Sequence, residues 1–541
     1  MKRPDPKDTM ARLTLSWTHK EDALIVDSEG EYAWVDRTDP RANEVRLLEE
    51  IDRVGKVSGT VSDNLLIRGD GLDALRALVK SPQYKSEYAG KVKLVYIDPP
   101  FNTGQAFEHY EDGVEHSVWL GLMRERLDLI ADLLAPDGSV WVHLDDAEMA
   151  YAKVLMDEIF GRSHFVSTVV WQRTNSPRNS AKHISQDVDY ILVYAQDIEK
   201  LQMNMLGRTA AMDDKFKNPD NDPRGPWFAA DLSARNFYSK GQYTVTAPAG
   251  KQHGPGAGRY WAVSEETLAE MDADNRVWWG KTRNNKPTRK LFLTDVKAGR
   301  IPSSMWLPEE VGYVRNGKQE TKALLGGNPF STPKPERLMD RVIQIGSNPG
   351  DIVVDVFAGS GTTAAVAHKL GRRWVTSEVI DYTVDTYTKP RLTKVVSGDD
   401  KGGISSAAGW TGGGGFRELR VTSPIYTVNA VGPLTILSIA SDTSDETLAQ
   451  SVAAQLGYAH DSHDEAPFAG RKGRSRLAVI RGTVDVDTVE ALLSGIEADE
   501  TLLIAATTVD PAAADHLRTL SRGSRIKRIP SALFPKGSVT K

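Results

Sequence analysis

An apolar run that ends in Asp98-Pro99-Pro100-Phe101 is the feature that most constrains the fold of this chain. Residues 93–97 predict a buried strand, and two consecutive prolines stop it because they cannot donate ladder hydrogen bonds and hold the chain extended. A carboxylate, a carbonyl and an aromatic ring then stand at the C-terminal end of a strand, where open α/β sheets bind ligands. Asp98 and the Pro99 carbonyl can accept hydrogen bonds from an amine on a planar ring, and Phe101 can stack on that ring. The alternative interpretation is a proline-terminated strand followed by an ordinary turn.

A second motif, residues 351–363, lies far downstream. It is a short apolar run that breaks into a glycine-rich turn before an alanine-rich helix. Gly359 and Gly361 permit the positive φ and the close backbone approach that a ligand at a helix N-terminus requires. No lysine follows the glycines, so the turn is not a Walker phosphate loop. Glu378 ends the next predicted strand about 20 residues later, the usual spacing for an acid that binds ribose hydroxyls.

Further short motifs accompany these two in a fixed order. They are Leu13-Thr-Leu-Ser-Trp17, Phe107-Glu-His-Tyr110, His116-Ser-Val-Trp119, Leu144-Asp145-Asp146, Asp189-Tyr-Ile-Leu-Val-Tyr194 and Lys334-Pro335. Over roughly residues 10–395 the chain resembles the β class of DNA amino-methyltransferases, in particular the modification subunits of type III restriction–modification systems. The resemblance implies transfer of a methyl group from S-adenosyl-L-methionine to the N6 amine of adenine in duplex DNA. Transfer to cytosine N4 and a non-catalytic DNA-specificity subunit remain as alternatives.

The resemblance also assigns roles to individual residues. The acceptor site is formed by Asp98, Pro99, Pro100 and Phe101. The donor site is formed by Asp355, Phe357, Gly359, Ser360, Gly361, Thr362 and Thr363 around the methionine part, Glu378 at the ribose, Asp70 at the adenine and Lys334 at the carboxylate. Asp70 follows a predicted strand at residues 64–68, and its alternative role is a turn and helix cap. No metal is expected.

The implied fold is an α/β, Rossmann-like methyltransferase sheet. It is circularly permuted, because the acceptor motif precedes the glycine turn. We expect an N-terminal extension (1–60), an acceptor part (61–195), a target-recognition domain (196–332), a cofactor-binding part (333–395), a mobile Gly/Ser-rich linker (396–416) and a small C-terminal α/β domain (417–541). Family analogy suggests a homodimer and a restriction subunit, with helicase and nuclease activity, as a further partner.

Composition is consistent with these expectations. A chain of 541 residues is long enough for two or three domains. The absence of cysteine fits a reducing, cytoplasmic setting and excludes a thiolate metal site. No apolar run is long enough for a membrane span, and the N-terminus lacks a signal-peptide core.

Charge is distributed unevenly along the chain. Residues 172–334 carry 24 Lys and Arg against 18 Asp and Glu, a net +6 on a chain whose total is −6. Basic and aromatic residues are interleaved in this segment, which suits phosphate contact and base stacking. We therefore predict that Arg283, Asn284, Asn285 and Lys286 face DNA. The alternative is a small domain whose aromatic residues form its own core.

Overall fold

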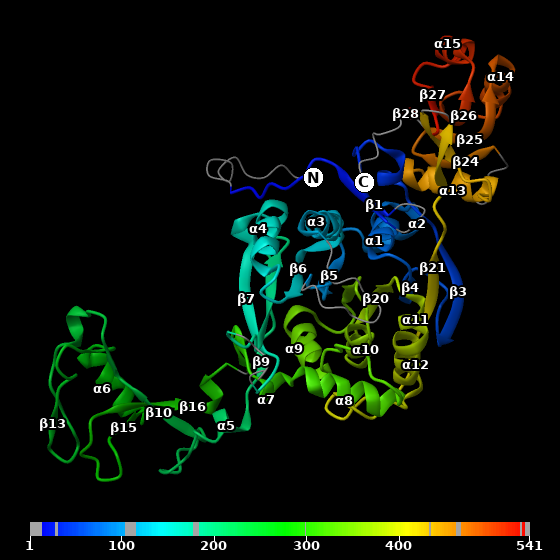
Figure 1. Cartoon of the computed structure of the whole chain (residues 1–541). Helices are drawn as coiled ribbons and strands as arrows, with labels where there is room; N and C mark the ends of the chain where they lie inside the picture. Colours follow the sequence, from blue (N-terminus) through cyan, green and yellow to red (C-terminus); the bar gives the residue numbers. More distant parts are fainter. Residues whose placement is uncertain are drawn as a thin grey trace. The chain divides into compact units, whose positions relative to one another are not determined.

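The computed structural model describes residues 13–26, 31–102, 115–176, 183–297, 299–431, 434–460, 467–530 and 533–535. These residues divide into two compact units (Figure 1). Met205–Pro302 forms the smaller unit, and the larger unit contains the described residues on either side of it. Within the described part of the chain, no helix combines the length and the apolar character needed to cross a membrane.

A mixed ten-stranded sheet forms the centre of the larger unit. In spatial order its strands are β18 (Met305–Trp306), β7 (Phe165–Gln172), β8 (Val188–Ala195), β6 (Leu134–Leu144), β5 (Val92–Ile97), β19 (Ile352–Asp355), β20 (Arg373–Glu378), β4 (Asn64–Arg68), β21 (Gly415–Val421) and β3 (Leu48–Gly55). The six strands from β6 to β21 run parallel to one another. β8 and β3 flank them and run antiparallel to their neighbours. The predicted α/β class is therefore confirmed, as are the predicted strands of both motifs.

Helices cover both faces of this sheet (Figure 1). One face carries α1 (Gly71–Lys80), α2 (Pro82–Tyr88), α3 (His116–Leu133) and α4 (Met149–Phe160), and the other carries α8 (Val314–Leu325), α9 (Glu336–Gly346), α10 (Thr362–Lys369) and α12 (Lys389–Ser397). Alternate residues of one strand point to opposite faces. Thus Ile97 of β5 packs in the core with Trp119 of α3, whereas Leu94 lies against Gly346 of α9. The parallel strands are buried on both faces, which explains their continuous apolar sequences.

The smaller unit has its own core of Leu232, Trp261, Leu268, Val277 and Trp279. Its elements are β9 (Leu206–Gly207), α5 (Ala210–Asp213), β10 (Trp227–Asp231), β11 (Ser233–Ala234), β12 (Val245–Thr246), β13 (Gln252–His253), β14 (Tyr260–Trp261), α6 (Glu265–Ala273), β15 (Val277–Trp278), β16 (Thr288–Phe292) and β17 (Gly299–Arg300). The smaller unit contains fewer residues than the predicted target-recognition segment 196–332. The difference arises because β18 joins the main sheet and α8 packs on α12. Several of its aromatic residues are core residues, as the alternative interpretation expected.

The structure differs from the prediction at residues 396–416, which do not form a mobile linker. Ile404 is buried, and the indole of Trp410 donates a hydrogen bond to the Val395 carbonyl at 2.8 Å. Gly398 has a φ of +78°, and a Cβ there would lie 2.2 Å from the Thr411 carbonyl oxygen. These glycines therefore permit close packing of the backbone, which composition alone cannot distinguish from flexibility. The segment leads into β21, so the C-terminal domain begins after the main sheet and not at residue 417.

The C-terminal region contains the predicted strand–helix pairs. Its elements are β22 (Tyr426–Val431), β23 (Leu434–Ile439), α13 (Asp445–Leu456), β24 (Phe468–Lys472), β25 (Ser475–Val484), α14 (Val486–Ser494), β26 (Thr501–Val509), α15 (Pro511–Leu520), β27 (Arg525–Arg528) and β28 (Leu533–Pro535). β25, β26 and β27 pair in parallel, and the helices cover an apolar core. At the other end of the chain, β1 (Ala23–Val26) and β2 (Tyr32–Val35) form a hairpin, and β3 extends the main sheet.

Candidate functional site

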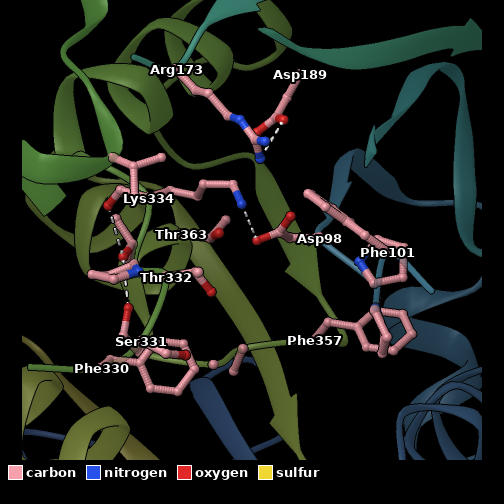
Figure 2. Close-up of a pocket in the computed structure, with 18 of the residues that line it drawn as sticks. Asp98, Phe101, Arg173, Asp189, Phe330, Ser331, Thr332, Lys334, Phe357 and Thr363 are labelled. Atoms are coloured by element: carbon pink, nitrogen blue, oxygen red, sulfur yellow. Dashed lines mark hydrogen bonds and ion pairs between the residues drawn. The ribbon is translucent and has the colours of Figure 1, made fainter. Parts of the chain in front are cut away.

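A cavity of about 410 Å³ lies where β5 and β19 end side by side (Figure 2). These strands belong to the two motifs of the sequence, and their parallel pairing brings both motifs to one edge of the sheet. The cavity is lined by Tyr96, Asp98, Pro99, Pro100, Phe101, Asp145, Arg173, Gln186, Asp189, Val314, Lys318, Phe330, Ser331, Thr332, Pro333, Lys334, Asp355, Phe357, Ala358, Gly359, Ser360, Thr362 and Thr363. Two motifs far apart in the sequence thus contribute to one site, as predicted.

Asp98 makes one strong contact and leaves one oxygen available. Its Oδ2 forms an ion pair with Lys334 Nζ at 2.7 Å, which Figure 2 shows across the cavity. Its Oδ1 is buried, yet it accepts no hydrogen bond from any described residue. A buried carboxylate oxygen that accepts no hydrogen bond lowers the stability of the fold. It therefore points to a ligand that supplies the hydrogen-bond donor. Lys334, predicted at the donor carboxylate, is engaged with Asp98 here, and its contact with the donor stays a prediction.

Contacts from α3, β6 and the N-cap of α4 hold the segment that carries Asp98. The Trp119 indole of α3 donates a hydrogen bond to the Pro100 carbonyl at 2.7 Å. Phe101 stacks on His143 of β6, with ring centroids 5.9 Å apart and planes inclined by 23°. The side-chain amide of Asn102 donates a hydrogen bond to Glu148 Oε1 at 2.7 Å, and the backbone of Asn102 has a φ of +57°. The predicted motif Phe107–Tyr110 lies outside the described residues.

The glycine turn has the conformation that its sequence predicts. Gly359 and Gly361 have φ values of +48° and +74°, and Gly361 caps the N-terminus of α10. Glu378 Oε2 accepts a hydrogen bond from the Gly359 amide at 2.9 Å. Asp355 accepts one from the Phe357 amide at 3.0 Å, and burial raises the pKa of Asp355 to about 7. The two acids therefore hold the backbone of the turn through hydrogen bonds.

Asp70 and Glu378 lie at the ends of neighbouring strands, as predicted, but neither lines the cavity. Asp70 caps α1 by accepting a hydrogen bond from the Leu72 amide at 2.6 Å. Both of its oxygens also contact Arg126 Nη2, at 2.7 and 2.8 Å. The helix-cap interpretation is therefore correct, and donor binding by Asp70 and Glu378 stays a prediction.

The residues predicted to face DNA lie in the smaller unit, and two of them support its own loops. Lys286 Nζ donates to the Pro255 carbonyl at 2.8 Å and lies 5.0 Å from the centroid of Trp261. Asn284 accepts a hydrogen bond from the Lys251 amide at 3.0 Å. Arg283 and Asn285 are exposed, and Arg283 has a φ of +56°. DNA contact by these four residues stays a prediction.

Sequence reasoning missed the polar residues at the wall and back of the cavity. Arg173 and Asp189 line it, and His143 lies behind Phe101. A signal was present, because Asp189 and His143 interrupt sequences that otherwise predict buried strands. A buried ionisable group near a cavity is a candidate functional residue.

Comparison with known proteins gives the family. The chain is 32% identical over 387 residues to the StyLTI Mod subunit of a type III restriction–modification enzyme from Salmonella typhimurium, covering 62% of this chain and 57% of the relative. It is 31% identical to the probable HindVI Mod subunit of Haemophilus influenzae, covering 66% and 54%. The chain thus spans just over half the length of these two relatives.

Solved structures include a putative DNA modification methylase from Thermus thermophilus complexed with S-adenosyl-L-methionine. It is 16% identical, with 61% of this chain and 95% of that protein covered and a TM-score of 0.31. A family model described as DNA methylase matches residues 92–389, more than half of the 541-residue chain, and by that match the chain belongs to the DNA methylase family.

Proposed function

We propose that the chain transfers a methyl group from S-adenosyl-L-methionine to the N6 amine of adenine in duplex DNA, as the modification subunit of a restriction–modification system. One observation carries the assignment of the site. Asp98 Oδ1 is buried and accepts no hydrogen bond from a described residue, and it lies in the same cavity that the glycine turn lines. An exocyclic amine supplies the missing hydrogen-bond donor. Membership of the DNA methylase family indicates that this amine belongs to a nucleic-acid base.

The acceptor half of the cavity suits an extruded base. Asp98 Oδ1 and the Pro99 carbonyl accept the two hydrogens of the amine, which orients its nitrogen lone pair towards the donor. Phe101 stacks on the ring and holds its plane. Extrusion costs a few kcal/mol, which backbone contacts and stacking offset. Alignment in a cavity that excludes water then supplies most of the acceleration.

The donor half suits S-adenosyl-L-methionine, which supplies an electrophilic methyl group when bound. Gly359 and Gly361 let a ligand approach the backbone, because a Cβ at either position would narrow the turn. The first amides of a helix have no partner within the helix, so the N-terminus of α10 suits an anionic group such as a carboxylate. Glu378 and Asp70 are assigned to the ribose and the adenine.

The domain arrangement supports the same proposal. The late position of β19 and β20 in the chain, although they lie between β5 and β4 in the sheet, supports a circularly permuted methyltransferase sheet. The segment 196–332, with the compact unit Met205–Pro302 inside it, is assigned to target recognition. The C-terminal domain is assigned to a second copy of the chain or to a restriction subunit.

Modification-sensitive sequencing tests the activity, the base and the recognition sequence together. DNA is taken from cells that produce the protein and from cells that do not. Methylated adenine at a defined sequence, present only in the first sample, is the expected result. Methylated cytosine would transfer the assignment to N4 of that base, and DNA without either modification would refute the proposal.

Lysines of the smaller unit provide a further prediction. Lys281 is exposed, and Lys281→Ala should weaken binding to all duplexes and reduce the slope of log affinity against log salt concentration by about 1. Lys286→Ala should in addition lower the melting temperature, because Lys286 also holds the Pro255 loop. Fluorescence anisotropy at several salt concentrations and thermal unfolding measure both. Unchanged salt dependence in Lys281→Ala would contradict the assignment of this lysine to DNA.

A further inference from the structure

Four polar side chains form a continuous chain at the acceptor half of the cavity, and the proposed chemistry gives them no role. Tyr96, Asp189 and Arg173 line the cavity, and His143 lies behind Phe101. The Tyr96 hydroxyl contacts His143 Nδ1 at 2.7 Å, and His143 Nε2 contacts Asp189 Oδ2 at 3.3 Å. Asp189 Oδ1 forms an ion pair with Arg173 at 3.0 Å, which Figure 2 shows at the cavity wall. His143 is fully buried, and Tyr96 and Asp189 are each 1% exposed. Burial of so many polar groups requires that each be satisfied by a specific partner.

The partners of His143 fix its protonation state and its tautomer. Burial, reinforced by the charge of Lys334, lowers the pKa of His143, so the ring is neutral at neutral pH. A neutral imidazole has one donor and one acceptor nitrogen. Burial alone would raise the pKa of Asp189, but the His143 hydrogen bond and the nearby cations hold it below its usual value. Asp189 is therefore a carboxylate that accepts from Nε2–H, and Tyr96 donates to Nδ1.

This arrangement also fixes the orientation of the imidazole plane. Two hydrogen bonds hold the ring in its own plane, and the Trp171 ring meets it edge-on, at 5.5 Å and 89°. Phe101 stacks on this ring with an inclination of only 23°. Lys334 Nζ also lies 5.1 Å from the centroid of the Phe101 ring, so the imidazole and this ammonium together determine how Phe101 is presented to the cavity.

We propose that His143 is a positioning residue for the acceptor base, held by Tyr96 and Asp189 so that Phe101 presents one fixed face to that base. The inference rests on the proposed function and deepens it. It predicts that loosening His143 lowers the rate of methyl transfer without weakening donor binding. A displacement of about 1 Å at a reacting group can reduce the rate by about 100-fold.

Two variants that each remove one buried tyrosine hydroxyl test the inference. Tyr96→Phe removes the donor to His143. Tyr194→Phe is the matched control, because Tyr194 is equally buried, lies on β8 and donates to Asp157 at 2.7 Å, and it does not line the cavity. We expect Tyr96→Phe to lower kcat by about 10- to 100-fold, with an unchanged Kd for S-adenosyl-L-methionine and a melting temperature close to that of Tyr194→Phe. Tyr194→Phe should keep the kcat of the parent.

A duplex with 2-aminopurine at the mapped target position adds a readout of stacking. The fluorescence of the extruded base should be quenched by Phe101 in the parent and in Tyr194→Phe, and it should be higher in Tyr96→Phe. Asp189→Asn replaces a charged acceptor of the Nε2–H by a neutral one, so it should change kcat and fluorescence in the same direction as Tyr96→Phe but by a smaller amount.

Three results would overturn the inference in different ways. Parental kcat and quenching in both Tyr96→Phe and Asp189→Asn would show that His143 does not position Phe101. An equal loss of kcat in Tyr194→Phe would reduce the effect to general loosening of the sheet. A parent protein that methylates no DNA would refute the proposed function itself, and the role of His143 with it.

Discussion

Asp98→Ala is expected to abolish methyl transfer while largely sparing donor binding. The substitution removes the buried Oδ1 that accepts from the amine, and the donor half of the cavity is formed by other residues. Loss of one aligned polar contact in a closed site lowers rates by about 100- to 1000-fold. Incorporation of radiolabel from S-adenosyl-L-methionine into genomic DNA measures the loss, and calorimetry measures donor affinity.

Two further variants separate chemistry from stability. Asp98→Ala also leaves the buried ammonium of Lys334 without its partner, which can destabilise the fold. Asp98→Asn preserves the size of the side chain and one acceptor oxygen, so it should retain more activity than Asp98→Ala. Asp146→Ala removes an exposed acid outside the cavity and should behave as the parent. Parental activity in Asp98→Ala would contradict the catalytic assignment.

Gly359→Val is expected to lower the affinity for S-adenosyl-L-methionine by at least about 10-fold. Gly359 has a φ of +48°, which a β-branched residue strongly disfavours, and a Cβ there would lie 3.3 Å from the Phe330 ring on the cavity wall. The new side chain therefore both strains the turn and occupies space that a ligand needs. Calorimetric titration of the donor measures the effect directly.

Gly350→Val is the matched control for backbone strain. Gly350 has a φ of +88°, and nothing lies within 4 Å of the position of its Cβ, at the start of β19 and away from the cavity. Both substitutions should destabilise the protein by about 1–3 kcal/mol through strain. Only Gly359→Val should weaken donor binding. Equal donor affinities in the two variants would remove the glycine turn from the donor site.

The sequence by itself determined the local conformations on which the site depends. Consecutive prolines end β5 at Ile97, directly before Asp98, and glycines give the turn after β19 its positive φ values. These residues restrict or permit backbone angles irrespective of their surroundings. The apolar runs likewise predicted the parallel strands, since strands buried on both faces require them. Asp70 shows the limit of such reasoning, because capping a helix and binding a ligand place the same demand on the local sequence.

Tertiary structure alone decided which side chains meet. Lys334, which precedes α9, reaches Asp98 because both residues line one cavity, and His143 lies behind Phe101 because β6 pairs with β5. The same holds for residues 396–416. Their glycines are typical of a flexible linker, but Ile404 is buried and the segment leads into β21, which lies between β4 and β3. Strand order depends on packing over the whole core, so the sequence of a single segment does not determine which strands become its neighbours. Local backbone preferences are encoded residue by residue, whereas pairings between segments follow from the fold as a whole.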